Sequence, residues 1–193
     1  IMPLLGKFDA VVTDPPYGYK DHGIVRTGGG WSKKYQKDTN INNWDFRPPK
    51  SFFDHVMSNS EFQLIWGGNY FTGDLPNNRG FFVWHKKTIS ENFSMAMAEY
   101  AWTNLNVNAK VFHFQPQNSD RKHPTQKPVE LMDWCLGFLP NSETILDPFM
   151  GSGTTGVACA KLGRKFTGIE LDPDYFEIAV QRITKAYEQR DLF

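Results

Sequence analysis

The chain has 193 residues, a length that fits one domain with a substantial buried core. Lysine plus arginine and aspartate plus glutamate number 21 each, so net charge gives no sign of a polyanionic partner. No apolar run approaches the roughly 20 residues of a membrane-spanning helix and no signal peptide is visible, so we expect no membrane association.

Two further features bear on the setting of the protein. The only cysteines, Cys135 and Cys159, lie in apolar helical patterns and have no partner at metal-ligand spacing. We therefore expect a reduced, cytoplasmic environment, a packing role for both thiols and no metal site. The chain starts abruptly at Ile1 rather than at a methionine, so we expect the natural N-terminus to be missing.

The predicted elements alternate between strand and helix along the chain. A short buried strand is expected at 8–13, ending at a Pro-Pro turn because proline cannot sit in the centre of a strand. Helices are expected at 49–57, 128–139, 153–162 and 173–189, and strands at 62–66, 80–85, 100–105, 109–114, 144–146 and 166–170. The strands at 100–105 and 109–114 are expected to pair around Asn106. This alternation predicts an α/β fold with a mostly parallel sheet and helices on both faces.

A long polar segment, 19–49, interrupts this pattern and is expected to be a mobile loop. Between Tyr19 and Lys50 the chain carries seven basic and three acidic residues. A basic stretch on a neutral protein favours a local contact with phosphate, and a solvated polar loop is the alternative.

A glycine-rich segment near the C-terminus, residues 151–156 (GSGTTG), fits the pattern GxGxxG. It follows a predicted strand, opens a predicted helix, and is followed by Glu170 at the end of the next strand, as in dinucleotide sites. An oxidoreductase of the NAD type is therefore one hypothesis. Against it, Asp147 would repel a pyrophosphate, Phe149 is bulky where small residues are favoured, and no second nucleotide-binding half follows. S-adenosylmethionine is cationic and carries no phosphate, so it suits an acidic loop better.

A second motif, Asp14-Pro15-Pro16-Tyr17, follows the first predicted strand. Ligands bind at such strand ends in open α/β sheets. The Asp14 carboxylate and the Pro15 carbonyl are suited to accept the two hydrogens of a planar amino group, and Tyr17 to stack on the ring that carries it. The motif thus predicts a site for the exocyclic amino group of a base.

The two motifs, in this order, resemble those of the beta-class DNA amino-methyltransferases. A third segment, 123–128 (HPTQKP), also matches that family. The resemblance implies a circularly permuted Rossmann-like methyltransferase sheet, one catalytic domain over 1–193, S-adenosylmethionine as cofactor and double-stranded DNA as partner. It also implies catalytic roles for Asp14, Pro15, Pro16 and Tyr17, and cofactor-binding roles for Thr125, Lys127, Asp147, Phe149, Gly151, Ser152, Gly153, Thr154 and Glu170. Thr125 and Lys127 would contact the methionine part of the cofactor, with Lys127 pairing with its carboxylate.

The function implied is methyl transfer to a flipped base, with adenine N6 favoured over cytosine N4 because the motif begins with aspartate. Such enzymes serve restriction-modification. The family's usual strand and helix before the catalytic strand, and its large target-recognition insert, have no counterpart here. The segments 19–49 and 104–122 are the candidates for base recognition, with Trp31, Lys33, Lys34 and Tyr35 as contacts. Methylation of RNA or of a protein amide, an NAD-type oxidoreductase and a nonenzymatic DNA-binding module stay open as alternatives, and the sequence carries no signal for an oligomeric state.

Overall fold

A computed structural model describes residues 5–18, 45–87, 89, 96–115 and 126–190. In chain order its elements are β1 (Phe8–Thr13), α2 (Lys50–Asn59), β2 (Ser60–Trp66), the 3-10 helix η3 (Gly68–Tyr70), β3 (Phe81–His85), β4 (Ala98–Thr103), β5 (Lys110–His113), α3 (Val129–Leu136), β6 (Thr144–Asp147), α4 (Thr154–Lys161), β7 (Lys165–Gly168) and α5 (Pro173–Arg190). Most of the loop expected at 19–49, with its candidate base contacts, lies outside the described residues.

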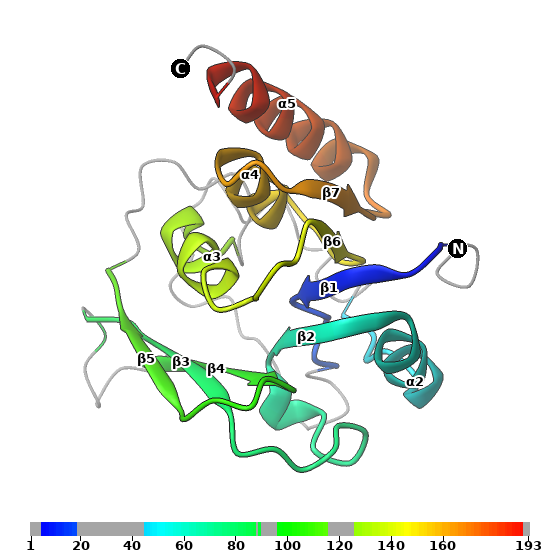
Figure 1. Ribbon diagram of the computed structural model, residues 1–193, viewed down its shortest axis with the longest axis vertical. Helices are drawn as coiled ribbons and strands as arrows, with labels where there is room; N and C mark the ends of the chain where they lie inside the picture. Colours follow the sequence, from blue (N-terminus) through cyan, green and yellow to red (C-terminus); the bar gives the residue numbers. More distant parts are fainter. Residues whose placement is uncertain (1–4, 19–44, 88, 90–95, 116–125, 191–193) are drawn as a thin grey trace.

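Seven strands form one sheet in the order β5-β3-β4-β2-β1-β6-β7 (Figure 1). β1 runs parallel to both of its neighbours, so that Ala10 pairs with Phe62 of β2 and with Ile145 of β6. β6 and β7 are parallel, as are β3 and β5, whereas β4 is antiparallel to β2 and β3. The expectation of a mostly parallel sheet is confirmed.

One expected strand pairing is wrong. The strands now seen as β4 and β5 were expected to pair with each other, but β3 lies between them. Val83 of β3 faces Tyr100 of β4 on one side and Val111 of β5 on the other. Short spacing between two strands in the sequence favours a hairpin, yet β3 buries Phe82 and Trp84 and serves both neighbours as a partner.

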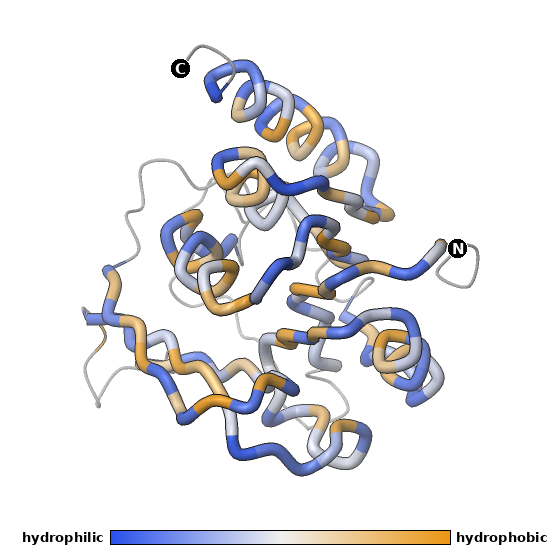
Figure 2. The backbone as a smooth tube through the Cα atoms, in the orientation of Figure 1, coloured by the Kyte–Doolittle hydropathy of each residue, from blue (hydrophilic) through white to orange (hydrophobic). Residues whose placement is uncertain are grey.

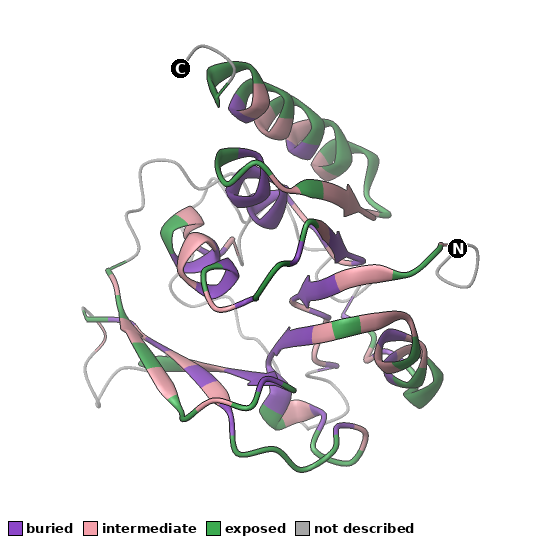
Figure 3. Cartoon of the chain, in the orientation of Figure 1, coloured by how far each residue is buried: buried purple, intermediate pink, exposed green. Residues whose placement is uncertain are grey.

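The sheet separates two apolar cores, and alternate residues of β1 face opposite sides. Ala10 and Val12 pack with residues of α3 and α4, whereas Val11 packs with Phe53 and Val56 of α2. Helices therefore cover both faces, as expected. α5 lies outside α4 as a further layer. α4 is buried for nearly its whole length, whereas α5 buries only one side (Figure 3). Polar and apolar residues accordingly alternate along the turns of α5 (Figure 2).

This topology brings the two predicted motifs to the same edge of the sheet. Because β1 and β6 are parallel neighbours, their carboxyl ends lie side by side, with Asp14 following one and Asp147 ending the other. The carboxyl ends of parallel strands are where open α/β sheets bind ligands. None of the helices within the described ranges is both long and apolar enough to cross a membrane.

Candidate active site

The Asp14–Tyr17 motif follows β1 in a turn that packs against the segment after β2. The Tyr17 hydroxyl donates a hydrogen bond to Asp14 Oδ1 at 2.5 Å. The Tyr17 ring stacks on Tyr70, with centroids 4.6 Å apart and planes inclined by 13°, and meets Phe71 edge-on. Gly67, at φ +69°, lies under this ring: a Cβ there would come within 2.1 Å of Tyr17 Cε1. The Tyr17 ring can therefore occupy this position only because residue 67 has no side chain.

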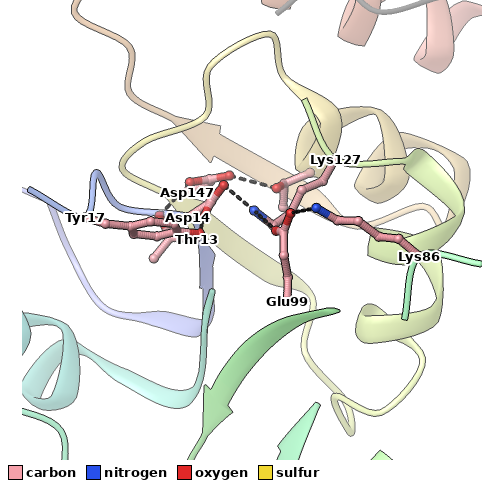
Figure 4. Close-up of polar contacts among 8 residues, drawn as sticks. Thr13, Asp14, Tyr17, Lys86, Glu99, Lys127 and Asp147 are labelled. Carbon is pink, nitrogen blue, oxygen red and sulfur yellow. Dashed lines mark hydrogen bonds and ion pairs between the residues drawn. The ribbon is translucent and has the colours of Figure 1, made fainter. Parts of the chain in front are cut away.

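A row of alternating charges leads from Asp14 to Lys86 (Figure 4). The Lys127 ammonium donates to Asp14 Oδ2 and lies 3.2 Å from Glu99 Oε2. The other oxygen of Glu99, Oε1, lies 2.5 Å from Lys86 Nζ. Both ammonium groups also lie over indole rings, Lys127 over Trp66 and Lys86 over Trp84. The row therefore holds two negative and two positive charges.

Burial and ion pairing shift the pKa values of Glu99 and Lys127 in opposite directions. Burial disfavours the charged form of Glu99, but the charges of Lys127 and Lys86 outweigh it and lower the pKa of Glu99 to about 2. Burial likewise disfavours the charged form of Lys127, yet Asp14 and Glu99 outweigh it and raise the pKa of Lys127. Glu99 and Lys127 are accordingly ionised at neutral pH, although the side chain of Lys127 is only 5% exposed.

Lys86 and Glu99 did not emerge from the sequence. Lys86 directly follows β3, and Glu99 lies near the start of the antiparallel β4, so the two residues meet at the strand ends where Lys127 also arrives. A charged residue directly after a strand was the one local signal present. The contact between Lys86 and Glu99 depends on the pairing of β3 with β4, which short sequence motifs do not predict.

Asp147 is a buried carboxylate that the protein itself satisfies. It accepts hydrogen bonds from the hydroxyls of Thr13 and Thr155, at 2.8 and 2.7 Å, and from the backbone N–H of Phe149 at 3.1 Å. Burial raises the pKa of Asp147 to about 6, although these three hydrogen bonds act to lower it. Asp147 thus ties the glycine loop to β1 and to the first turn of α4.

The glycine loop combines an open turn with close helix packing. Gly151 and Gly153 have φ values of +51° and +78°. A Cβ at Gly153 would lie 2.9 Å from Ala179 Cβ, and one at Gly156 would lie 2.4 Å from Ile183 Cδ1. Two glycines therefore allow the turn, and Gly153 and Gly156 let α5 approach α4.

Other predicted cofactor residues gather around this loop. Ser152 donates to Gln126 Oε1 at 3.2 Å and accepts from Arg182 at 3.0 Å, which links the loop to the segment that carries Lys127. Phe149 packs edge-on against Phe52 of α2. Thr154 is buried at the start of α4.

Glu170, another predicted cofactor residue, makes its hydrogen bonds in the turn before α5. It follows β7, and its Oε1 accepts the backbone N–H groups of Leu171 and Asp172. Thr125 lies outside the described residues. Within the described ranges, histidine, cysteine, aspartate and glutamate form no group of three or more that could hold a metal ion.

Comparison with known proteins defines the class. Residues 83–181, about half of the chain, match the sequence profile of the DNA methylase family that comprises N6 and N4 amino-methyltransferases. The chain belongs to this family.

Particular relatives agree with that assignment. The type II methyltransferase M2.LlaDCHI of Lactococcus lactis subsp. cremoris is 49% identical over 65 residues, which are 33% of this chain and 24% of that protein. The match thus spans about a quarter of the relative's length.

Solved structures of methyltransferases share the fold. The M1.HpyAVI–SAM complex aligns with a TM-score of 0.60 at 23% identity, over 92% of this chain and 89% of that one. The cytosine-N4-specific PvuII DNA methyltransferase aligns with a TM-score of 0.62 at 13% identity, over 98% and 88% of the two chains. The protein therefore has the Rossmann-like methyltransferase fold, in the permuted order expected from its motifs.

Proposed function

We propose that the protein transfers the methyl group of S-adenosylmethionine to the exocyclic amino group of a base in double-stranded DNA, with adenine N6 favoured over cytosine N4. One observation carries this proposal. Thr13, the residue before Asp14, is hydrogen-bonded to Asp147, which also holds the glycine loop. An amino-group acceptor and a cofactor loop thus lie at adjacent strand ends, although 134 residues separate Thr13 from Asp147.

The loop fits a nucleoside cofactor. At Gly151, whose φ is positive, a Cβ would meet nothing within 4 Å among the described residues, so the backbone here faces open space at the ligand-binding edge of the sheet. We assign the loop at 149–154 to the nucleoside, Glu170 to the ribose hydroxyls, and Thr125 and Lys127 to the methionine part. S-adenosylmethionine supplies, when bound, a methyl group on a positively charged sulfur.

The residues of the chain act on the amino group. Its lone pair is delocalised into the base ring, which makes it a weak nucleophile. Asp14 and the carbonyl of Pro15 accept its two hydrogens, which favours a pyramidal nitrogen with its lone pair directed at the methyl group. Tyr17 stacks on the base, an interaction worth roughly 1–3 kcal/mol. The base must leave the helical stack to reach this position, at a cost of a few kcal/mol that binding offsets.

Lys127 is compatible with both of its roles. An ammonium group has three N–H donors. In the structure Lys127 contacts Asp14 and Glu99, and its remaining donor capacity suits the cofactor carboxylate. The type II relative further supports a role in restriction-modification.

The test is the transfer of labelled methyl from S-adenosylmethionine to unmethylated duplex DNA, followed by nucleoside analysis. N6-methyladenine is the expected product, and N4-methylcytosine would reverse the base preference. Asp14→Ala is the control: we expect it to abolish transfer while cofactor binding persists. Full activity in that variant would refute the role of Asp14.

Parallel incubations separate the alternatives. Label in RNA or in a protein amide, with none in DNA, would reassign the acceptor. Binding of NAD that S-adenosylmethionine does not displace would favour the oxidoreductase, and retention on DNA without turnover would favour a binding module.

A further inference from the structure

Both oxygens of Asp14 already have protein partners. The Tyr17 hydroxyl bonds Oδ1 at 2.5 Å, and the Lys127 ammonium bonds Oδ2. A carboxylate oxygen has two lone pairs and can accept a further hydrogen bond. The buried ammonium group of Lys127 competes with a substrate amino group for these lone pairs, because hydrogen bonds between charged groups are stronger than those from neutral donors. The tightness of the Asp14–Lys127 contact therefore decides how readily Asp14 accepts an amino group from a substrate.

Lys127 cannot simply withdraw from Asp14. Its side chain is 5% exposed, and a buried ammonium without a partner is strongly unfavourable. Glu99 offers a second carboxylate, with Oε2 only 3.2 Å from Lys127 Nζ. Lys127 can therefore loosen its contact with Asp14 and stay paired.

Lys86 fixes the orientation of that second carboxylate. It contacts Oε1 of Glu99 at 2.5 Å, which leaves Oε2 directed at Lys127. Figure 4 shows the two ammonium groups on opposite sides of the Glu99 carboxylate. A small movement of Lys127 along this row leaves every charge with a partner.

We propose that Glu99, oriented by Lys86, is a positioning residue for methyl transfer: it takes up the charge of Lys127 when Asp14 binds the amino group of the target base. This inference rests on the proposed function, since it concerns the same acceptor site. Glu99 does not touch the substrate in this scheme. It acts through Lys127, and Lys86 acts only through Glu99.

The first test is kinetic. Glu99→Gln keeps the shape of the side chain and removes its charge, so Lys127 has Asp14 as its one carboxylate partner among these residues. We expect kcat to fall by at least about tenfold because the acceptor is held away from its productive geometry. The fraction of molecules that bind S-adenosylmethionine should stay unchanged. A merely structural role would reduce that fraction instead.

Lys86→Met and the double variant sharpen this test. Lys86→Met should lower kcat less than Glu99→Gln does, and the double variant should be no worse than Glu99→Gln alone. Lys161→Met is the control, because it removes the exposed cation of a different ion pair, the one with the half-buried Asp133, and it should leave kcat unchanged. Wild-type kcat in Glu99→Gln, or additive losses in the double variant, would overturn the proposal.

The second test does not depend on activity. Asp14→Asn and Glu99→Gln each leave Lys127 with one carboxylate, and the double variant leaves it with neither. The loss of unfolding free energy in the double variant should therefore exceed the sum of the two single losses. Additive losses would show that Lys127 is not shared. A wild-type protein without methyl transfer would refute the proposed function, and this cycle would then still decide whether the lysine is shared.

Discussion

The hydroxyl of Thr13 donates a hydrogen bond to the buried carboxylate of Asp147 across the parallel pair β1–β6, at 2.8 Å. Thr13→Val keeps the side-chain volume and removes this donor. We expect a loss of about 1–3 kcal/mol in unfolding free energy at neutral pH, because Asp147 keeps its burial and loses a partner. Urea unfolding measures it. The control is Thr72→Val at an exposed position, whose unfolding free energy should stay within about 0.5 kcal/mol of the wild-type value. An equal loss in both variants would contradict this prediction.

The raised pKa of Asp147 predicts a pH dependence of stability. Its pKa is about 6 in the folded protein against an ordinary value of 3.8. Between about pH 4 and 6 the folded state thus binds more protons than the unfolded state, and stability falls as pH rises. The penalty is complete above pH 6 and absent below pH 4. A shift of about two units corresponds to about 3 kcal/mol.

Asp147→Asn removes this titration. The difference in unfolding free energy between wild type and variant should therefore shift by about 3 kcal/mol against the wild type from pH 4 to 6.5. Taking the difference cancels the contributions of groups such as Glu99, which titrates lower. A difference that does not change with pH would mean that Asp147 is ionised normally.

Gly67→Ala should displace Tyr17. The new methyl group would overlap the Tyr17 ring, and the positive φ disfavours any side chain. We expect a strong loss of methyl transfer, together with at least about 1 kcal/mol of stability. Gly73→Ala is the control, since a Cβ there meets nothing within 4 Å among the described residues. Equal activity in the two variants would mean that the position of Tyr17 is unimportant.

Alanine substitutions at two glycines of the loop should have different effects, one on cofactor binding and the other on stability. Gly151→Ala places a methyl group in open space where we propose the cofactor binds, so it should weaken S-adenosylmethionine binding at a cost of about 1–2 kcal/mol in stability from its φ. Gly156→Ala collides with Ile183 between α4 and α5 and should mainly destabilise the fold. Calorimetric titration and thermal unfolding of both variants provide the comparison. The reverse ranking of the two variants would contradict our assignment of the open side of the loop.

Glu170 has a local task besides its proposed contact with the ribose. Glu170→Gln retains the oxygen that accepts the N–H groups of Leu171 and Asp172. It should therefore keep the melting temperature while weakening cofactor binding, whereas Glu170→Ala should lower both. An unchanged Kd in Glu170→Ala would reject the ribose assignment.

Much of this fold was predictable because its signals are local. The run at 8–13 ends at Pro15 and Pro16 and is a strand over the expected residues, and Pro173 marks the start of α5 as expected. The order of the two motifs likewise implied, through the family resemblance, the permuted methyltransferase sheet that the protein has. Each of these inferences depends on residues close together in the sequence.

What the sequence did not reveal depends on distant partners. The insertion of β3 between β4 and β5 is decided by edge pairing, which periodicity does not encode. Glu99 and Lys86 acquire their role only when β4 folds back against β3. The stacking of Tyr17 on Tyr70 likewise joins two segments that are distant in the sequence, one after β1 and the other in η3.

The sheet order also has a consequence for the synthesis of the protein. β1 leaves the ribosome well before its partner β6, which follows more than 130 residues later. The ladder between them can close only after most of the chain has emerged, and contacts of such long sequence separation slow folding. Until then the apolar edge of β1 that faces β6 has to be shielded from other nascent chains. A chain interrupted before Asp147 contains the Asp14–Tyr17 motif but lacks the glycine loop to which β1 is hydrogen-bonded through Asp147.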